Sequence, residues 1–162
     1  MNRFKTFLVL LITFILQTTI FSKIDIFGAN INLIVPATVA LSQILGRKIG
    51  AYGGIIFGLM EDFLFTSLIG VRALSYFLIG SIVSSDRFNF SKDKTTGSVI
   101  TFVMTILNFL FVSALYYLFG EQIGLSNYLP LPLIIEAILN TLIYYIYIKI
   151  VKKIMYIPTY RI

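Results

Sequence analysis

Apolar residues occur in six long stretches of this chain, separated by short groups of polar residues or glycine. A helix that crosses a bilayer needs about 20 mostly apolar residues. The pattern therefore predicts about six transmembrane helices in a single domain, residues 1–162. The predicted spans are residues 6–22, 30–45, 49–65, 68–83, 97–119 and 131–150. The second and fourth are short, so the sequence leaves open whether they cross the membrane fully.

Composition supports a membrane protein. Hydrophobic residues make up 58% of the chain and charged residues 12%, against about 45–50% and about 25% in soluble domains. A soluble domain of this length has too little interior to bury so much apolar surface. We therefore expect an all-α integral membrane protein.

The positions of Lys and Arg predict the orientation. Eleven lie on one side of the predicted topology: Arg3, Lys5, Arg47, Lys48, Arg87, Lys92, Lys94, Lys149, Lys152, Lys153 and Arg161. The other side has only Lys23, and Arg72 lies within a span. Because cytoplasmic loops are enriched in these residues, both termini should be cytoplasmic. Residues 84–96 then form a cytoplasmic loop, either a solvated connector or a docking site for a cytoplasmic partner.

Several kinds of chemistry are excluded by composition. The chain has no cysteine and no histidine, so it cannot form disulfides, Cys/His zinc sites or histidine-based triads. It has no glycine-rich phosphate loop, and its positive charges lie at the ends of apolar runs rather than in a nucleic-acid-binding pattern. The sequence predicts neither an enzyme nor a bound cofactor or metal.

Glycines recur every four residues through the third predicted span, at Gly46, Gly50, Gly54 and Gly58. Residues four apart lie along one face of a helix, and small residues on such a face allow two helices to approach closely. The row predicts close packing, either within this chain or against a second protein.

Four ionisable residues lie within predicted spans, all in the outer half of the membrane: Glu61, Asp62, Arg72 and Glu136. A charge at the centre of a membrane helix costs at least about 2.5–3.5 kcal/mol, so such groups are normally paired. We expect an ion pair between Asp62 and Arg72. Glu61, about 100° further round the helix, would lie at the headgroups or against another group.

Uncharged polar residues extend this cluster. Glu136 and Asn140 share a face of the sixth predicted span, and Gln17 and Asn108 also need partners within the membrane. The cluster could clamp the bundle, contact a partner protein, or bind a ligand or ion. Tyrosines cluster near the span ends, and some of them are typical of an interfacial belt: Tyr116, Tyr117, Tyr128, Tyr144, Tyr145 and Tyr147.

The order of these features resembles the family of the rod shape-determining protein MreD. The matching marks are Leu16-Gln17-Thr18 at the end of the first span, Gly28 in the following loop, and the block from Gly54 through Gly58-Leu59 to Asp62. Gly70, Ala73, Tyr76 and Gly80 follow in the next span. The resemblance covers mainly residues 16–83. In the family a Pro-Asp-Leu-like sequence starts the second helix, whereas this chain has Ile31-Asn32-Leu33.

The resemblance implies a non-enzymatic subunit of the bacterial cell-elongation complex, needed for cell shape and lateral peptidoglycan synthesis. Such proteins lie in the cytoplasmic (inner) membrane as multi-pass proteins. They bind the bitopic protein MreC, and through it associate with MreB filaments and peptidoglycan synthases. The family's fold is similar to the S-components of energy-coupling-factor transporters.

Two alternatives remain. A vitamin-binding S-component would use the outer polar residues as a pocket, but such subunits usually carry Ala-x-x-x-Ala in the first helix, and residues 6–22 contain no alanine or glycine. A membrane enzyme or channel is disfavoured because the polar residues are concentrated in the outer half, with no polar face running through the membrane.

Overall fold

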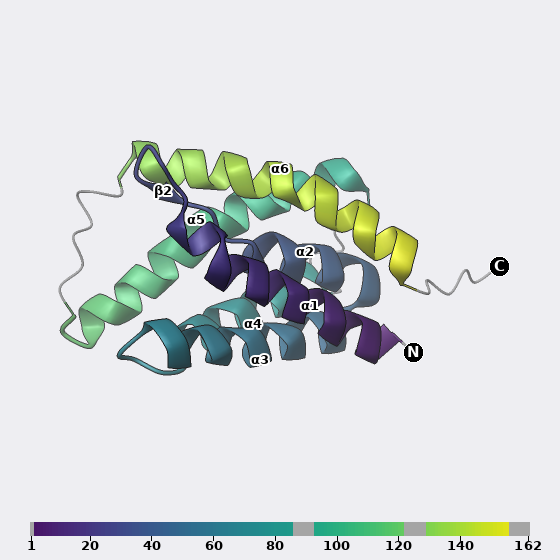
Figure 1. The fold of residues 1–162 in the computed structure, drawn as a ribbon, viewed down its shortest axis with the longest axis horizontal. Helices are drawn as coiled ribbons and strands as arrows, with labels where there is room; N and C mark the ends of the chain where they lie inside the picture. The colour runs from purple at the N-terminus through teal and green to yellow at the C-terminus, as the bar shows by residue number, and fades with distance from the viewer. Residues whose placement is uncertain (1, 86–92, 122–128, 156–162) are drawn as a thin grey trace.

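The computed structural model describes residues 2–85, 93–121 and 129–155, and within these ranges the chain forms a bundle of six helices (Figure 1). The helices are α1 (Asn2–Thr19), α2 (Ile34–Leu45), α3 (Arg47–Phe65), α4 (Val71–Val83), α5 (Lys94–Leu118) and α6 (Leu131–Ile154). A 3-10 turn, η1 (Phe21–Lys23), and an antiparallel hairpin of β1 (Asp25–Ile26) and β2 (Ala29–Asn30) join α1 to α2.

The helices correspond to the six predicted spans, with differences at their ends. The second begins at Ile34 rather than residue 30, and the fourth at Val71 rather than residue 68. α5 begins at Lys94, inside the predicted cytoplasmic loop, and residues 86–92 of that loop lie outside the described residues.

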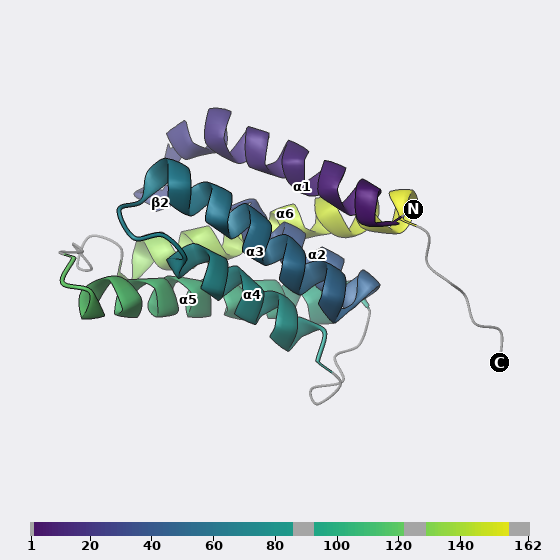
Figure 2. The same ribbon diagram turned by 90° about the horizontal axis from the view of Figure 1, so that it is seen from below.

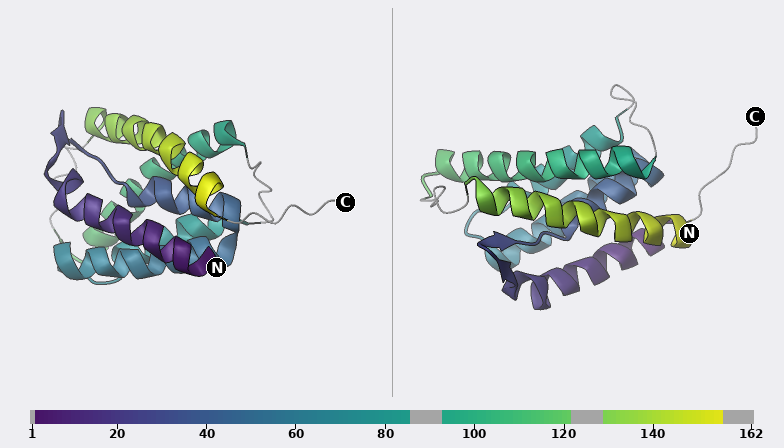
Figure 3. Two further views of the ribbon diagram at one scale, coloured as in Figure 1. Left: turned by 45° about the vertical axis from the view of Figure 1, so that its right-hand side comes forward. Right: turned by 90° about the horizontal axis from the view of Figure 1, so that it is seen from above.

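Helix α2 is the centre of the bundle, in contact with all five other helices (Figures 2 and 3). Every residue from Ile34 to Ile44 is buried. Its 12 residues extend about 18 Å at 1.5 Å per residue, well short of the roughly 30 Å hydrocarbon core of a bilayer. A short helix with an irregular start is tolerated at membrane depth when protein surrounds it.

Helices α3 and α4 pack at very close range through three glycines. A Cβ atom on Gly54 would lie 2.6 Å from the carbonyl oxygen of Tyr76, and one on Gly58 would overlap the backbone of Ala73. From the other helix, a Cβ on Gly80 would lie 2.7 Å from the backbone nitrogen of Ala51. These contacts are with backbone atoms, so larger side chains would push the helices apart.

The other two glycines of the predicted row differ from this pattern. Gly50 packs against Ser42 of α2, where a Cβ would overlap the serine side chain. Gly46 has no atom within 4 Å of a Cβ position and lies between α2 and α3 with a φ of +86°. Its assignment to the packing row is therefore wrong: the tight α2–α3 connection requires a backbone conformation that glycine adopts readily.

The surface of this bundle is far more apolar than that of a soluble protein, and its apolar core also contains charged and amide side chains. Large apolar side chains face outward along α1, α5 and α6, whereas Glu61, Asp62 and Asn140 are almost fully buried. In the part of the chain that the structure describes, three helical segments are long and apolar enough to cross a membrane: Arg3–Lys23, Lys94–Leu118 and Leu131–Ile154. Outward apolar faces of this extent identify a surface that contacts lipid or another protein.

The two ends of the bundle differ in the elements that form them and in their charge. The hairpin end contains β1 and β2, the C-terminal end of α3 and the N-terminal ends of α4 and α6 (Figure 1). The basic end contains the start of α1, the α2–α3 connection and the end of α6, where Lys5 Nζ donates to the Ile154 carbonyl oxygen at 2.8 Å. The described ends of the chain therefore lie on the same side of the bundle.

Candidate functional site

The site is built around the irregular start of α2, at the hairpin end. The Asn32 side-chain oxygen accepts hydrogen bonds from the backbone N–H groups of Ile34 and Val35, at 3.0 and 3.3 Å. These are N–H groups that the first turn of a helix leaves without intrahelical partners. Asparagine is among the preferred residues for capping them, so Asn32 fixes where α2 begins.

Side chains from two other helices hold this segment in place. From α1, Gln17 donates to the Ile31 carbonyl oxygen at 2.9 Å and accepts from the Leu33 N–H at 2.8 Å. From α6, Asn140 accepts from the Asn32 N–H at 3.1 Å and donates to Thr105 Oγ1 of α5 at 3.3 Å. The predicted polar residues Gln17 and Asn140 thus replace the backbone partners that a continuous helix would supply.

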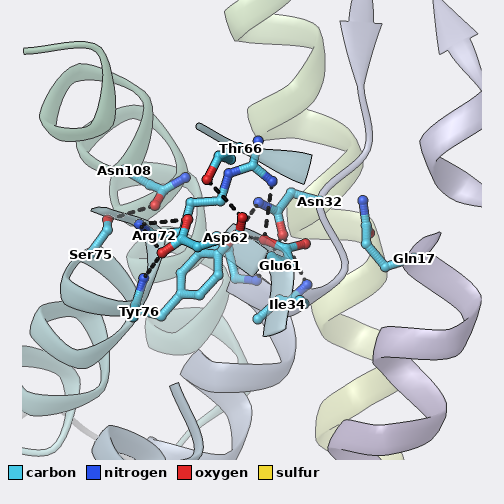
Figure 4. Close-up of polar contacts among 12 residues, drawn as sticks. Gln17, Asn32, Ile34, Glu61, Asp62, Thr66, Arg72, Ser75, Tyr76 and Asn108 are labelled. Carbon is cyan, nitrogen blue, oxygen red and sulfur yellow. Dashed lines mark hydrogen bonds and ion pairs between the residues drawn. The ribbon is translucent and has the colours of Figure 1, made fainter. Parts of the chain in front are cut away.

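The Asn32 amide continues the network into α3 and α4 (Figure 4). It donates to Tyr76 Oη at 2.9 Å, and Tyr76 Oη donates to Glu61 Oε2 at 2.7 Å. The same carboxylate oxygen lies 3.4 Å from Arg72 Nη1, the one ion pair within the described part of the chain. Glu61 is almost fully buried and the Arg72 side chain is one-third exposed, so the pair leads from the interior to the surface.

Asp62 has a different partner from the one predicted. Its carboxylate accepts hydrogen bonds from the backbone N–H groups of Gly70, Arg72 and Ala73, at 2.8, 3.1 and 3.2 Å. The predicted Asp62–Arg72 ion pair is therefore wrong. Of the two alternatives predicted for Glu61, the structure shows the second, contact with another group, and that group is Arg72. Because α4 starts immediately after Gly70, its free N–H groups, rather than the guanidinium, lie nearest Asp62. A carboxylate at a helix N-terminus also favours the helix dipole.

A cavity of about 560 Å³ lies beside this network at the hairpin end. Of the predicted residues, Gln17, Glu61, Arg72 and Glu136 line it, and so does Asn108. Glu136 lies close enough to interact with both Asn140 and Arg72. Asp62 and Asn140 do not line the cavity but support residues that do. Volumes of about 300–1,000 Å³ are usual for small-ligand pockets.

Some polar residues of the network were not among the predicted site residues. Asn32 could have been recognised as a helix cap, since asparagine immediately before an apolar run is a helix-start signal. Ser75 donates a hydrogen bond to Asn108 at 2.7 Å, and Ser75 is thus the partner that Asn108 was expected to need within the membrane. Nothing in the sequence indicated that Tyr76 would donate a hydrogen bond to Glu61.

Two of the tyrosines near the ends of the predicted spans are buried. Tyr144 donates to Gln43 of α2 at 2.5 Å, and Tyr147 donates to Thr13 of α1 at 2.8 Å. Both therefore tie α6 to its neighbours rather than forming a belt. A position near the end of an apolar run does not show whether a tyrosine lies at the membrane interface or inside the bundle.

The residues that line this site can form hydrogen bonds and pair with charged groups. In the ranges that the structure describes, no group of three or more acidic residues is placed to hold a metal ion. The cavity presents carboxylates, one guanidinium and amide groups. Such a surface can orient and bind a polar group.

The fold and this site define a small helical membrane protein whose interior is joined by a polar network at one end. The family model of the rod shape-determining protein MreD matches residues 1–154, so the chain belongs to this family of membrane proteins. The match also includes the C-terminal half, which the resemblance over residues 16–83 did not cover.

No curated protein and no solved structure matches this chain. The similarity of its fold to S-components therefore stays a prediction.

Proposed function

We propose that this chain is a non-enzymatic subunit of the bacterial cell-elongation complex, which binds an MreC-like bitopic membrane protein and supports lateral peptidoglycan synthesis. The observation that carries the proposal is the family match over residues 1–154. The polar network supports it, because its hydrogen bonds join all six helices into one bundle, as a scaffold subunit requires. MreB filaments and wall synthases would associate indirectly.

The proposal includes an orientation: a multi-pass protein of the cytoplasmic membrane, with the basic end inside and the hairpin end outside. The chain contains no cysteine, so Lys23→Cys and Lys149→Cys each introduce a unique thiol. In intact cells, a membrane-impermeant maleimide should label the first variant and not the second. Labelling of the second alone would contradict the orientation.

The function is tested by tagging the chain in its own host, extracting it in mild detergent and identifying the proteins that copurify. We expect a single-span protein with an extracytoplasmic coiled coil, together with wall synthases. Depletion of the chain should convert rods into rounded cells, and re-expression should restore them. Retention of rod shape without the chain would contradict the proposal.

One observation favours a second candidate, a substrate-binding S-component: the cavity of about 560 Å³ has the volume of a small-molecule pocket. In that case two ATPases and a helical coupling subunit would copurify instead. The lack of alanine and glycine in residues 6–22 argues against it, because the usual surface for the coupling subunit is missing.

A further inference from the structure

A second cavity lies at the opposite end of the bundle, between α1 and α3. The role inferred for it goes beyond the proposed function. This basic-end groove has a volume of about 690 Å³. Its floor and walls are mainly apolar, formed by Phe7, Leu10, Tyr52, Ile56 and Phe57 among others. At Gly53, which also lines the groove, α1 approaches α3 closely: a Cβ there would lie 2.7 Å from Leu10 Cδ1.

The rim of the groove is positively charged. Arg3 comes from α1, and Arg47 and Lys48 come from the first turn of α3. All three are exposed, and none has an ion pair within the described residues. No carboxylate lines the groove. The apolar interior and cationic rim together complement a molecule with a hydrocarbon part and a negative headgroup.

The start of α3 strengthens the attraction for a negative group. Its N-cap is Gly46, which provides no side-chain hydrogen bond, and its first turn contains no acidic residue. The N–H groups of a helix start, together with the helix dipole, favour an anion. Arg47 and Lys48 have the opposite charge to the one this position prefers, so a bound anion would satisfy both the cations and the helix start.

An independent observation comes from Thr6, on the α1 side of the groove. Its side chain lines the groove and is only 5% exposed, yet within residues 2–85, 93–121 and 129–155 its hydroxyl has no hydrogen-bond partner. A buried hydroxyl without a partner is unfavourable by about 1–3 kcal/mol. A lipid phosphate or ester oxygen in the groove would supply the missing acceptor.

We propose that the groove between α1 and α3 binds an anionic phospholipid, with its phosphate at the start of α3 and an acyl chain between the two helices. Basic pockets between membrane helices on the cytoplasmic side are suited to such headgroups. The lipid would fill the gap beside α1, which lies at the edge of the bundle (Figure 2).

The test uses the full chain, purified in mild detergent and stripped of lipid. Dioleoyl phosphatidylglycerol, dioleoyl phosphatidylcholine and inorganic phosphate are added separately at equal concentration, and binding is followed by native mass spectrometry and thermal melting. We expect phosphatidylglycerol alone to bind and to raise the melting temperature. An equal effect of phosphatidylcholine would show that the groove does not recognise charge. An equal effect of phosphate would reveal an anion site without a lipid. Either result overturns the proposal.

Substitutions then locate the site. Arg47→Gln with Lys48→Gln should weaken phosphatidylglycerol binding roughly 10- to 30-fold, since each cation near the headgroups contributes about 1 kcal/mol. The matched control is Lys149→Gln with Lys152→Gln, two exposed cations of α6 that do not line the groove. The control should bind as the parent does, and an equal loss in both variants would contradict a localised site.

Thr6→Val provides a test that does not depend on charge. Because the hydroxyl has no hydrogen-bond partner among the described residues, this variant should fold as well as the parent without lipid. It should bind phosphatidylglycerol about fivefold more weakly, the effect of losing one hydrogen bond. Unchanged binding would contradict the placement of the headgroup, and this variant decides the question if the double glutamine variant does not fold.

Discussion

At the hairpin end of this bundle Glu61 and Asp62 are almost fully buried, whereas at the basic end Arg47 and Lys48 are exposed. The buried carboxylates are held by Tyr76 Oη, by a guanidinium and by backbone N–H groups. The exposed cations have no ion pair within the described residues. The contrast shows that charge serves the fold at one end and remains available to surrounding molecules at the other.

The largest expected effect tests the structural role of the hairpin end. Asp62→Leu should lower the free energy of unfolding by about 3–5 kcal/mol, because the buried N–H group of Ala73 and the half-buried ones of Gly70 and Arg72 lose their acceptor. Thermal melting in detergent measures the effect. The control, Asp62→Asn, retains one acceptor oxygen and should lose less. Equal melting of parent and Asp62→Leu would disprove the capping role.

The close α3–α4 contact can be tested in the same way. Gly58→Ala should lower stability by about 1–3 kcal/mol, because its Cβ would overlap the backbone of Ala73 and the two helices must separate. Gly53→Ala is the matched control on the same helix, since its Cβ meets only the end of the flexible Leu10 side chain. Similar losses of stability in the two variants would show that the close approach of the Ala73 backbone is not what excludes a side chain at residue 58.

The choice of partner for Arg72 calls for a double-mutant cycle. Glu61→Gln and Arg72→Gln, measured singly and together, should give a coupling energy of about 1–2 kcal/mol, because their side chains are in contact. The parallel cycle of Asp62→Asn with Arg72→Gln should give less than about 0.5 kcal/mol, since Asp62 binds the backbone of Arg72. A larger coupling energy in the second cycle would show that Arg72 pairs with Asp62 rather than with Glu61.

The smallest effect is expected at the basic end. Without lipid, Arg47→Gln with Lys48→Gln should change the free energy of unfolding by no more than about 0.5 kcal/mol, as is usual for exposed side chains. Removal of two cations from a helix N-terminus can even stabilise α3 slightly. A loss of several kcal/mol in thermal melting would mean that these residues also support the fold.

The sequence predicted the number of helices and the gathering of polar residues at one end, since both depend on hydropathy and charge along the chain. It did not predict that α2 would be the central helix. A short apolar run is equally suited to lipid and to a protein interior, so burial of α2 depended on how the other helices assemble. The sequence marked Gly54 and Gly58 because a repeat of small residues has a direct geometric meaning.

The prediction of Asp62 as the ionic partner of Arg72 failed for a specific reason. Helix periodicity places Glu61 and Asp62 about 100° apart, but it does not say which of the two faces the start of the next helix. That depends on where α4 begins, at Val71 rather than at residue 68. A shift of three residues turned a predicted side-chain ion pair into a backbone cap and made Glu61 the ionic partner.

The bond between Asn140 and the Asn32 N–H joins residues 108 positions apart. During biosynthesis the start of α2 therefore enters the membrane long before its partner on α6 has been translated. Until α6 is inserted, this segment must be protected by lipid headgroups, water or the insertion machinery. A chain truncated before Leu131 would contain the first five helices and lack this closing contact. Completion of the bundle is thus a late event of synthesis, coupled to the arrival of its last helix.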